Sequence, residues 1–128
     1  RQRQMCIRDS TYAGGIGTNY RFHEKELDIA DDKIARLTEL SDRLHAADYQ
    51  ELMYIYELRE RLLVCRSVIA HLKARKETRW HSFAENLDYP EKDDAHWKKY
   101  VNSRMKNGKL EIVFRDLVEE GQNYEHCH

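Results

Sequence analysis

The chain has 128 residues, of which 35% are charged and 41% apolar, with a formal net charge of -1. The length suits one small domain, the sequence lacks the roughly 20-residue apolar run that a membrane-spanning helix needs, and the balanced charge gives no field that would attract nucleic acid. Its three scattered cysteines argue against a disulfide framework. We therefore expect a cytoplasmic protein with no nucleic-acid partner and no direct membrane insertion.

The N-terminal segment shows no helical or strand periodicity. Residues 1–10, RQRQMCIRDS, share no pattern with the rest of the chain and are interpreted as a non-native lead. Residues 11–22 are predicted to form an irregular lead-in that contains Gly14, Gly15 and Gly17. These glycines could form a phosphate loop, but no strand precedes them and no Lys-Ser/Thr ending comes after them. We favour a tight turn there.

Residues 23–46 are predicted to form the first long helix. Apolar side chains recur at steps of three and four residues, and acidic residues in the first turns complement the helix dipole. The apolar stripe comprises Leu27, Ala30, Ile34, Leu37, Leu40 and Leu44.

Residues 48–76 are predicted to form a second, longer helix. Asp48 is a plausible N-cap, and Glu51 stands where a capping box places its acidic residue. The short break between the helices predicts an antiparallel helical hairpin. The main apolar stripe comprises Leu52, Ile55, Leu58, Leu62, Cys65, Ile69 and Leu72.

The second helix carries apolar residues on more than one face. Burying each large apolar side chain is worth roughly 1.5–3 kcal/mol, so one neighbouring helix would leave much stability unused. We therefore expect this helix to pack against more protein than the 128 residues supply. The residues off the main stripe are Met53, Tyr56, Leu63, Val64 and Val68.

The C-terminal part is predicted to contain a loop over residues 77–92, a short helix from Asp93 to about Lys99 and a β-hairpin. Asn107-Gly108 is the preferred type I′ turn pair, and apolar residues alternate on both sides of it. Residues 119–128 are interpreted as a flexible tail. The predicted fold is mainly α: a helical hairpin, then a loop, a short helix and a C-terminal β-hairpin.

Several residue groups could carry chemistry. The His126-Cys127-His128 tail could ligate a metal, but ligand spacing that closes a tetrahedral site is absent. The basic and aromatic cluster around Arg75 and Arg79 could hold RNA or an anionic ligand, but we favour cations that complement a helix C-terminus, followed by a docking loop. Paired carboxylates could do acid–base work, but we favour a solvated face and helix caps. The carboxylates are Glu77, Glu85, Asp88, Glu91, Asp93 and Asp94.

A motif series from residue 51 to residue 97 is the most distinctive feature. It contains Glu51-Leu52-Met53, then Arg75-Lys76-Glu77-Thr78-Arg79-Trp80, then Asp88-Tyr89-Pro90-Glu91, Asp93-Asp94 and Trp97. In this order and spacing, it resembles the C-terminal region of the fumarate reductase/succinate dehydrogenase flavoprotein family, in the adenylylsulfate reductase alpha subunit branch. The resemblance covers residues 11–118.

The resemblance implies that the chain is the C-terminal helical domain of a longer FAD-dependent oxidoreductase. The flavin-binding and catalytic parts of the family lie upstream, so we expect no FAD, metal or catalytic residue on this fragment alone. The implied partners are the remainder of the flavoprotein chain and an iron–sulfur electron-transfer subunit. A free-standing helical-hairpin protein-interaction module is the alternative. The candidate interface residues are Arg75, Arg79, Trp80, Tyr89 and Trp97.

Overall fold

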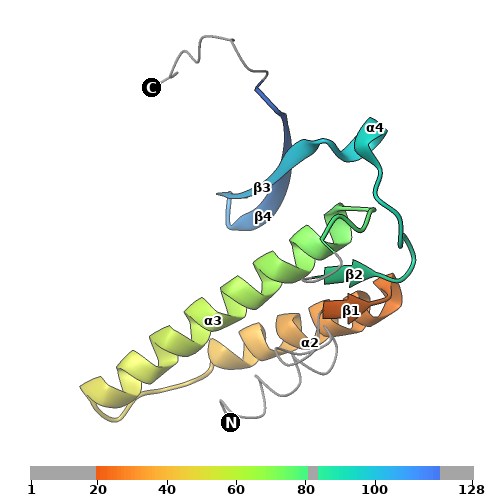
Figure 1. The fold of residues 1–128 in the computed structure, drawn as a ribbon. Helices are drawn as coiled ribbons and strands as arrows, with labels where there is room; N and C mark the ends of the chain where they lie inside the picture. The colour runs from red at the N-terminus through yellow and green to blue at the C-terminus, as the bar shows by residue number, and fades with distance from the viewer. Residues whose placement is uncertain (1–19, 81–83, 119–128) are drawn as a thin grey trace.

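The computed structural model describes residues 20–80 and 84–118. Two long helices form a hairpin, and a short helix and an antiparallel β-hairpin follow them, as the sequence predicts (Figure 1). The elements in chain order are β1 (Tyr20–Phe22), α2 (Glu24–Ser41), α3 (Tyr49–Ala74), β2 (Ala84–Asn86), α4 (Asp94–Trp97), β3 (Lys99–Lys106) and β4 (Lys109–Asp116).

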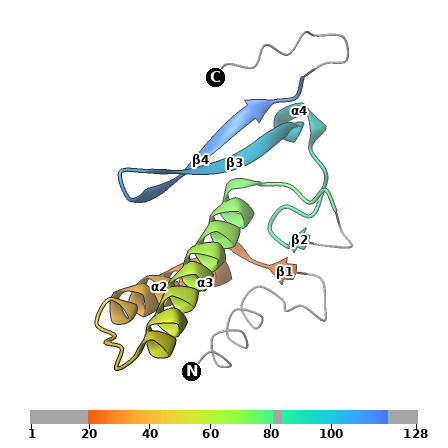
Figure 2. The ribbon, with the colours of Figure 1, turned by 90° about the vertical axis from the view of Figure 1, so that its left-hand side faces the viewer.

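Helices α2 and α3 lie side by side and enclose the core between them (Figures 1 and 2). The middle of each predicted stripe faces this core, where Leu27 and Leu62 are almost fully buried, whereas Leu40, Leu44 and Leu52 are exposed. Cys65 is half-buried and packs against the core. The buried apolar residues are Phe22, Leu27, Ala30, Ile34, Leu62 and Ile69.

The N-terminus of α3 is capped as the sequence predicts. The Asp48 carboxylate accepts a hydrogen bond from the Glu51 amide at 2.8 Å. The Glu51 carboxylate in turn accepts from the Ala47 amide at 2.8 Å, one residue earlier than the usual capping box. The cap therefore fixes both the start of α3 and the turn that leads into it.

Helix α2 ends at Ser41, so the predicted end near residue 46 is wrong. Arg59 of α3 donates to the Ser41 carbonyl at 3.3 Å and pairs with Asp42 at 3.3 Å, which satisfies the helix end. Ser41 is buried at this point, whereas Leu40 and Leu44 are exposed. Helix α3 ends at Ala74, close to the predicted residue 76.

Strands β1 and β2 are absent from the prediction, which placed an irregular lead-in and a loop at these residues. They pair in parallel, with Tyr20 opposite Ala84 and Phe22 opposite Asn86. The pairing brings Phe22 into the core. Each strand spans 3 residues, which is too short for an alternating apolar pattern to stand out.

The β3–β4 hairpin has the predicted turn. Asn107 and Gly108 both have positive φ, 51° and 73°, as a type I′ turn requires. Val101 lies opposite Phe114 and Met105 opposite Leu110. The hairpin crosses the C-terminal half of α3 (Figure 2), where the Ser67 and Ser103 hydroxyls lie 3.5 Å apart.

The short helix α4 begins where the sequence predicts. The Asp93 carboxylate accepts from the His96 amide at 3.1 Å and caps it. The helix ends at Trp97, and the predicted last residue, Lys99, instead begins β3. No helix within the described ranges is long and apolar enough to cross a membrane.

Candidate functional site

The chain that leaves α3 forms an ionic junction centred on Glu77. Arg75 leaves the helix in an extended conformation (φ -90°, ψ 109°), so side chains two residues apart point to one side. The Glu77 side chain is 0% exposed. Its carboxylate accepts from Arg79 Nε at 2.9 Å, Arg79 Nη2 at 3.1 Å, the Asp93 amide at 2.9 Å and Arg75 Nη1.

The surroundings of Glu77 keep it ionised. Burial alone would raise the pKa of its carboxyl. Hydrogen bonds from Arg79, the Asp93 amide and Arg75 outweigh burial, and together they lower the pKa below its ordinary value. Glu77 is therefore a buried anion between two cations, which suits a structural role.

Arg75 connects this junction to α4 and β3. Its guanidinium donates to the Trp97 carbonyl at 3.0 Å and to the Lys99 carbonyl at 2.8 Å. It also lies 6.0 Å from the centroid of the Trp97 ring, within cation–π range. Trp97 meets Phe114 of β4 edge-on, with ring centroids 5.7 Å apart. The junction thus attaches the β-hairpin to the end of α3.

Thr78 holds the loop that comes next. Its buried hydroxyl accepts from the Asn86 amide at 3.0 Å and donates to the Tyr89 carbonyl at 2.8 Å. In the same loop, the Asp88 carboxylate accepts from the Glu24 amide at 2.7 Å, at the start of α2. These bonds join the start of α2 and the chain just after α3 to residues 86–89.

The predicted interface residues fall into two groups. Arg75 and Arg79 direct their guanidiniums into the junction, and Trp97 is half-buried beside it. Trp80, by contrast, is 70% exposed, and Tyr89 is exposed with the Lys76 ammonium 5.9 Å from its ring centroid. Their contact with a partner stays a prediction.

Glu77 and Thr78 are the residues at this site that sequence reasoning missed. Glu77 was grouped with carboxylates of a solvated face, and for Glu77 that interpretation is wrong because it is buried. The signal was present in the sequence, since Arg75 and Arg79 flank it at a spacing of two residues. Asp88 and Asp93 do act at helix starts, which confirms the cap interpretation for them.

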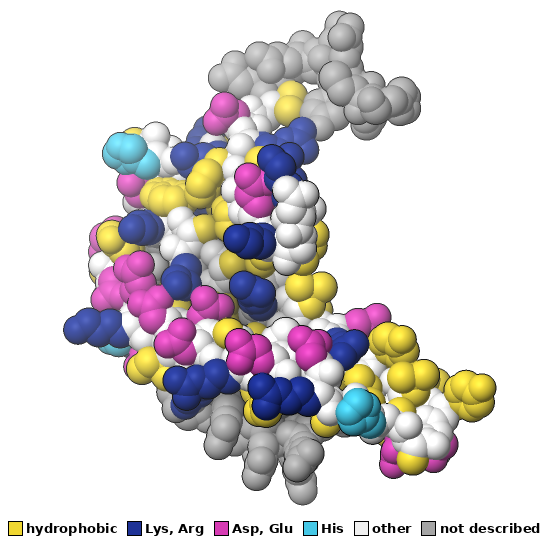
Figure 3. All heavy atoms as spheres, turned by 180° about the vertical axis from the view of Figure 1, so that it is seen from behind, with side chains coloured by type: hydrophobic (Ala, Val, Ile, Leu, Met, Phe, Trp, Pro, Cys, Tyr) yellow, Lys and Arg dark blue, Asp and Glu magenta, His cyan; other side chains and the backbone are white. Residues whose placement is uncertain are grey.

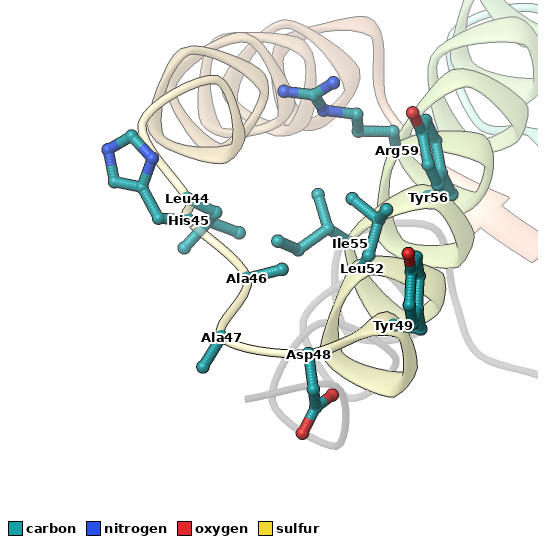
Figure 4. A pocket seen from close by; sticks show the side chains of 10 residues that line it. All are labelled: Leu44, His45, Ala46, Ala47, Asp48, Tyr49, Leu52, Ile55, Tyr56 and Arg59. Carbon is teal, nitrogen blue, oxygen red and sulfur yellow. The ribbon is translucent and has the colours of Figure 1, made fainter.

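A hollow of about 480 Å³ lies between the turn after α2 and the first turns of α3 (Figure 4). Leu52 and Ile55 point into it from α3, and Tyr49 and Tyr56 flank it. The residues that line it are Leu44, His45, Ala46, Ala47, Asp48, Tyr49, Leu52, Ile55, Tyr56 and Arg59.

The described residues do not fit FAD. A dinucleotide site needs a glycine-rich turn between a strand and a helix, and Gly108 lies instead in the hairpin turn. Arg59, the cation of the hollow, already pairs with Asp42. Gly14, Gly15 and Gly17 lie outside the described residues, as does the His126-Cys127-His128 tail. Among residues 20–80 and 84–118, no cluster of histidine, cysteine or acidic side chains could hold a metal ion.

Helix α3 leaves much apolar surface uncovered, as the sequence predicts. The exposed fractions are 62% for Met53, 57% for Tyr56 and 61% for Val64. Seen from behind, hydrophobic side chains gather at the projecting end of the helical hairpin (Figure 3). Exposed apolar surface of this extent is typical of an interaction surface.

Residues 20–125 match the protein family described as "Fumarate reductase flavoprotein C-term". The adenylylsulfate reductase subunit alpha of Megalodesulfovibrio gigas is 35% identical over 100 residues, which is 78% of this chain and 15% of that protein. The chain therefore spans about a seventh of the length of this curated relative.

Solved structures share the fold. Adenylylsulfate reductase from Archaeoglobus fulgidus matches with a TM-score of 0.80 and 34% identity, over 88% of this chain and 18% of that chain. E. coli quinol fumarate reductase matches with a TM-score of 0.73 over 90% of this chain and 20% of that chain. Its identity of 22% supports likeness of fold alone.

Proposed function

This chain belongs to the fumarate reductase flavoprotein C-terminal family, and on that premise we propose that it is the C-terminal helical domain of a longer FAD-dependent oxidoreductase. One observation carries the proposal. The chain keeps the fold of adenylylsulfate reductase over 88% of its own length while accounting for only 18% of that chain. This relation supports the proposal that the segment is one part of a larger enzyme.

In this proposal FAD binds to the upstream part of the polypeptide, where it supplies the two-electron chemistry. The described residues of this chain contribute no flavin contact. Their role is to support the flavoprotein, because the Glu77 junction and the Thr78 loop fix the β-hairpin and both ends of the helical hairpin as one unit.

We propose further that the loop after α3 contacts an iron–sulfur electron-transfer subunit. Exposed Trp80 and Tyr89 supply the rings that anchor such interfaces. The loop is held in place by contacts within the chain that involve Arg75, Arg79 and Trp97. A loop that is already held in one conformation loses less conformational freedom on binding, which favours affinity.

The substrate we propose is adenylylsulfate, and the proposed location is the cytoplasm. Identity to adenylylsulfate reductases is 34% and 35%, compared with 22% to a fumarate reductase. The dicarboxylate branch is therefore the second choice for the reaction.

The test begins with the coding sequence upstream of Thr11. We expect an open frame with a glycine-rich dinucleotide fingerprint, and the polypeptide it encodes together with this chain should show a stoichiometric flavin spectrum. The purified 128-residue chain is the control and should show none. Adenylylsulfate-dependent oxidation of a reduced dye, with fumarate as the comparison substrate, then tests the branch. Stoichiometric flavin on the isolated chain would contradict the proposal.

The alternative, a free-standing helical-hairpin interaction module, draws on the caps and the junction, whose bonds close within the chain. It predicts that no flavoprotein frame precedes the chain and that the 128 residues unfold in one cooperative transition. The upstream sequence separates the two hypotheses directly.

A further inference from the structure

Helix α3 carries a second stripe, on the side away from the core. Its residues recur at alternating steps of four and three along the whole helix, which is the spacing of a coiled-coil seam. Such a seam packs against another helix by inserting side chains between those of its partner. The stripe comprises Tyr49, Met53, Tyr56, Glu60, Leu63, Ser67, Ala70 and Ala74.

The C-terminal half of this stripe is occupied. Its residues are small, and the β-hairpin crosses there, with Ser67 against Ser103 and with Ala70 and Ala74 lining a hollow shared with Leu110. The N-terminal half has large side chains and is uncovered. We call this half the open seam; it consists of Tyr49, Met53, Tyr56, Leu63 and the adjoining Val64.

The open seam continues into the hollow at the tip of the helical hairpin. Tyr49 and Tyr56 belong to both, and Leu52 and Ile55 point into the hollow from the same turns of α3 (Figure 4). A helix laid along the open seam would reach this hollow with a side chain at its end. The two features therefore adjoin on one side of α3.

Glu60 is the one charged position in the stripe. Within the described part of the chain its carboxylate forms no ion pair or hydrogen bond, and it is exposed. In register, a second copy of this chain would set Glu60 against Glu60 in a parallel pair, and an antiparallel pair centred between residues 56 and 57 would set it against Met53. Covering an unpaired carboxylate is costly, so the stripe favours a partner helix that places a cation opposite Glu60.

We propose that the open seam receives an α-helix from the upstream flavoprotein body of the same polypeptide, with a Lys or Arg facing Glu60. This inference rests on the proposed function. The chain accounts for 15% of its curated relative, so most of the polypeptide remains to supply the helix. A partner on the same polypeptide also docks at high effective concentration, so a seam of modest length suffices.

A crosslinking experiment on the complete polypeptide tests the partner. Tyr56 is replaced by the photoreactive residue p-benzoylphenylalanine, and Tyr100 serves as the matched control because its exposure is 55%, against 57% for Tyr56. We expect Tyr56 to crosslink within one polypeptide to an upstream helix, and Tyr100 not to reach that helix. Crosslinks between two copies, crosslinks to a strand or loop, or no crosslink at Tyr56 would overturn the proposal.

A charge reversal tests the cation opposite Glu60. In the complete polypeptide, Glu60→Lys should speed amide exchange in the N-terminal half of α3 on the order of tenfold, and reversing the crosslink-mapped Lys or Arg to Glu should restore it. Glu39→Lys, at an exposed position of α2, is the control and should leave this exchange unchanged. Failure of the second reversal to rescue the first would overturn the assignment.

The flavin spectrum separates the two levels of inference. If the complete polypeptide binds FAD but Tyr56 crosslinks to a second copy, the proposed function stands and the proposal of an upstream helix is overturned. If the complete polypeptide binds no FAD, the proposed function is overturned, whatever Tyr56 contacts.

Discussion

Glu77 joins three parts of the chain that are separate in sequence: the end of α3, the start of α4 and, through Arg75, the first residue of β3. An anion in this position is stabilising only while its partners remain in place. Removing one partner of a buried pair costs more than the pair itself contributes.

The first prediction concerns this carboxylate. Glu77→Gln should lower the free energy of unfolding by about 2–3 kcal/mol, because both arginines lose a charged acceptor while remaining partly buried. Urea unfolding followed by tryptophan fluorescence measures it, and amide exchange at residues 75–79 gives the local value. Glu111→Gln, in an exposed pair with Arg104 at 2.7 Å, should cost at most about 1 kcal/mol. Equal losses in the two variants would argue against a special role for Glu77.

The same carboxylate predicts a pH dependence. Its pKa in the folded chain lies below the ordinary value of 4.5, so its contribution is complete above that value. The contribution is lost as pH falls from about 4.5 through the lower pKa of the folded state. Unfolding measured from neutral pH down to about pH 3 should therefore show a shallower acid loss in Glu77→Gln than in the parent chain. A steeper acid loss of stability in Glu77→Gln than in the parent chain would contradict a lowered pKa for Glu77.

At the scale of elements, α3 depends on its cap. Asp48→Ala removes the acceptor of the Glu51 amide and should destabilise the helix start by about 1 kcal/mol. Amide exchange in the first turns of α3 should rise while exchange near residue 69 changes little. Asp48→Asn, which retains a capping oxygen, is the matched control and should keep most of the protection.

The β3–β4 turn depends on backbone conformation alone. Gly108 has φ 73°, and a methyl group added there would meet no atom within 4 Å. Gly108→Ala should therefore cost about 1 kcal/mol through the positive φ, without a steric clash. Exchange of the β3 and β4 amides measures the loss. Lys109→Ala, beside the turn, should have a smaller effect, and an equal effect would indicate a side-chain cause.

Local signals explain which elements the sequence could predict. The core stripe of α3, the Asp48 cap and the Asn107-Gly108 turn each involve residues close in sequence, and each is observed. The β1–β2 pair joins residues 22 and 86, and nothing local specifies that contact. The end of α2 was missed because Leu44 continues the apolar spacing, although it lines the tip hollow instead of the core.

In the candidate site, too, the sequence predicted only what local signals specify. The sequence indicated Arg75 and Arg79 because basic residues gather at a helix end, but their partners depend on tertiary packing. Burial of Glu77 requires Asp93 to approach from the next element, a contact that spacing alone could not predict. Exposure of Trp80 and partial burial of Trp97 likewise depend on the position of the hairpin.

At the scale of the whole molecule, the small core contrasts with the uncovered open seam. Among residues 20–80 and 84–118, six apolar residues are buried, whereas Met53, Tyr56 and Val64 are each more than half exposed. If the seam is covered only in the complete polypeptide, polar substitutions there should have opposite consequences in the two contexts. In the isolated chain they reduce the non-specific self-association that an exposed apolar surface promotes, and in the complete polypeptide they place charges in a packed interface.

The last prediction uses this difference in sign. The double variant Met53→Lys, Val64→Lys should increase the monomeric fraction of the isolated chain while changing its unfolding free energy by no more than about 0.5 kcal/mol. In the complete polypeptide the same pair should destabilise by about 3 kcal/mol or more, because unpaired ammonium groups would be buried. Sedimentation and thermal unfolding measure the two effects. Ile29→Lys, at an exposed apolar position of α2, should change neither measurement in either context. If the double variant does not destabilise the complete polypeptide, the open seam is exposed to solvent there too.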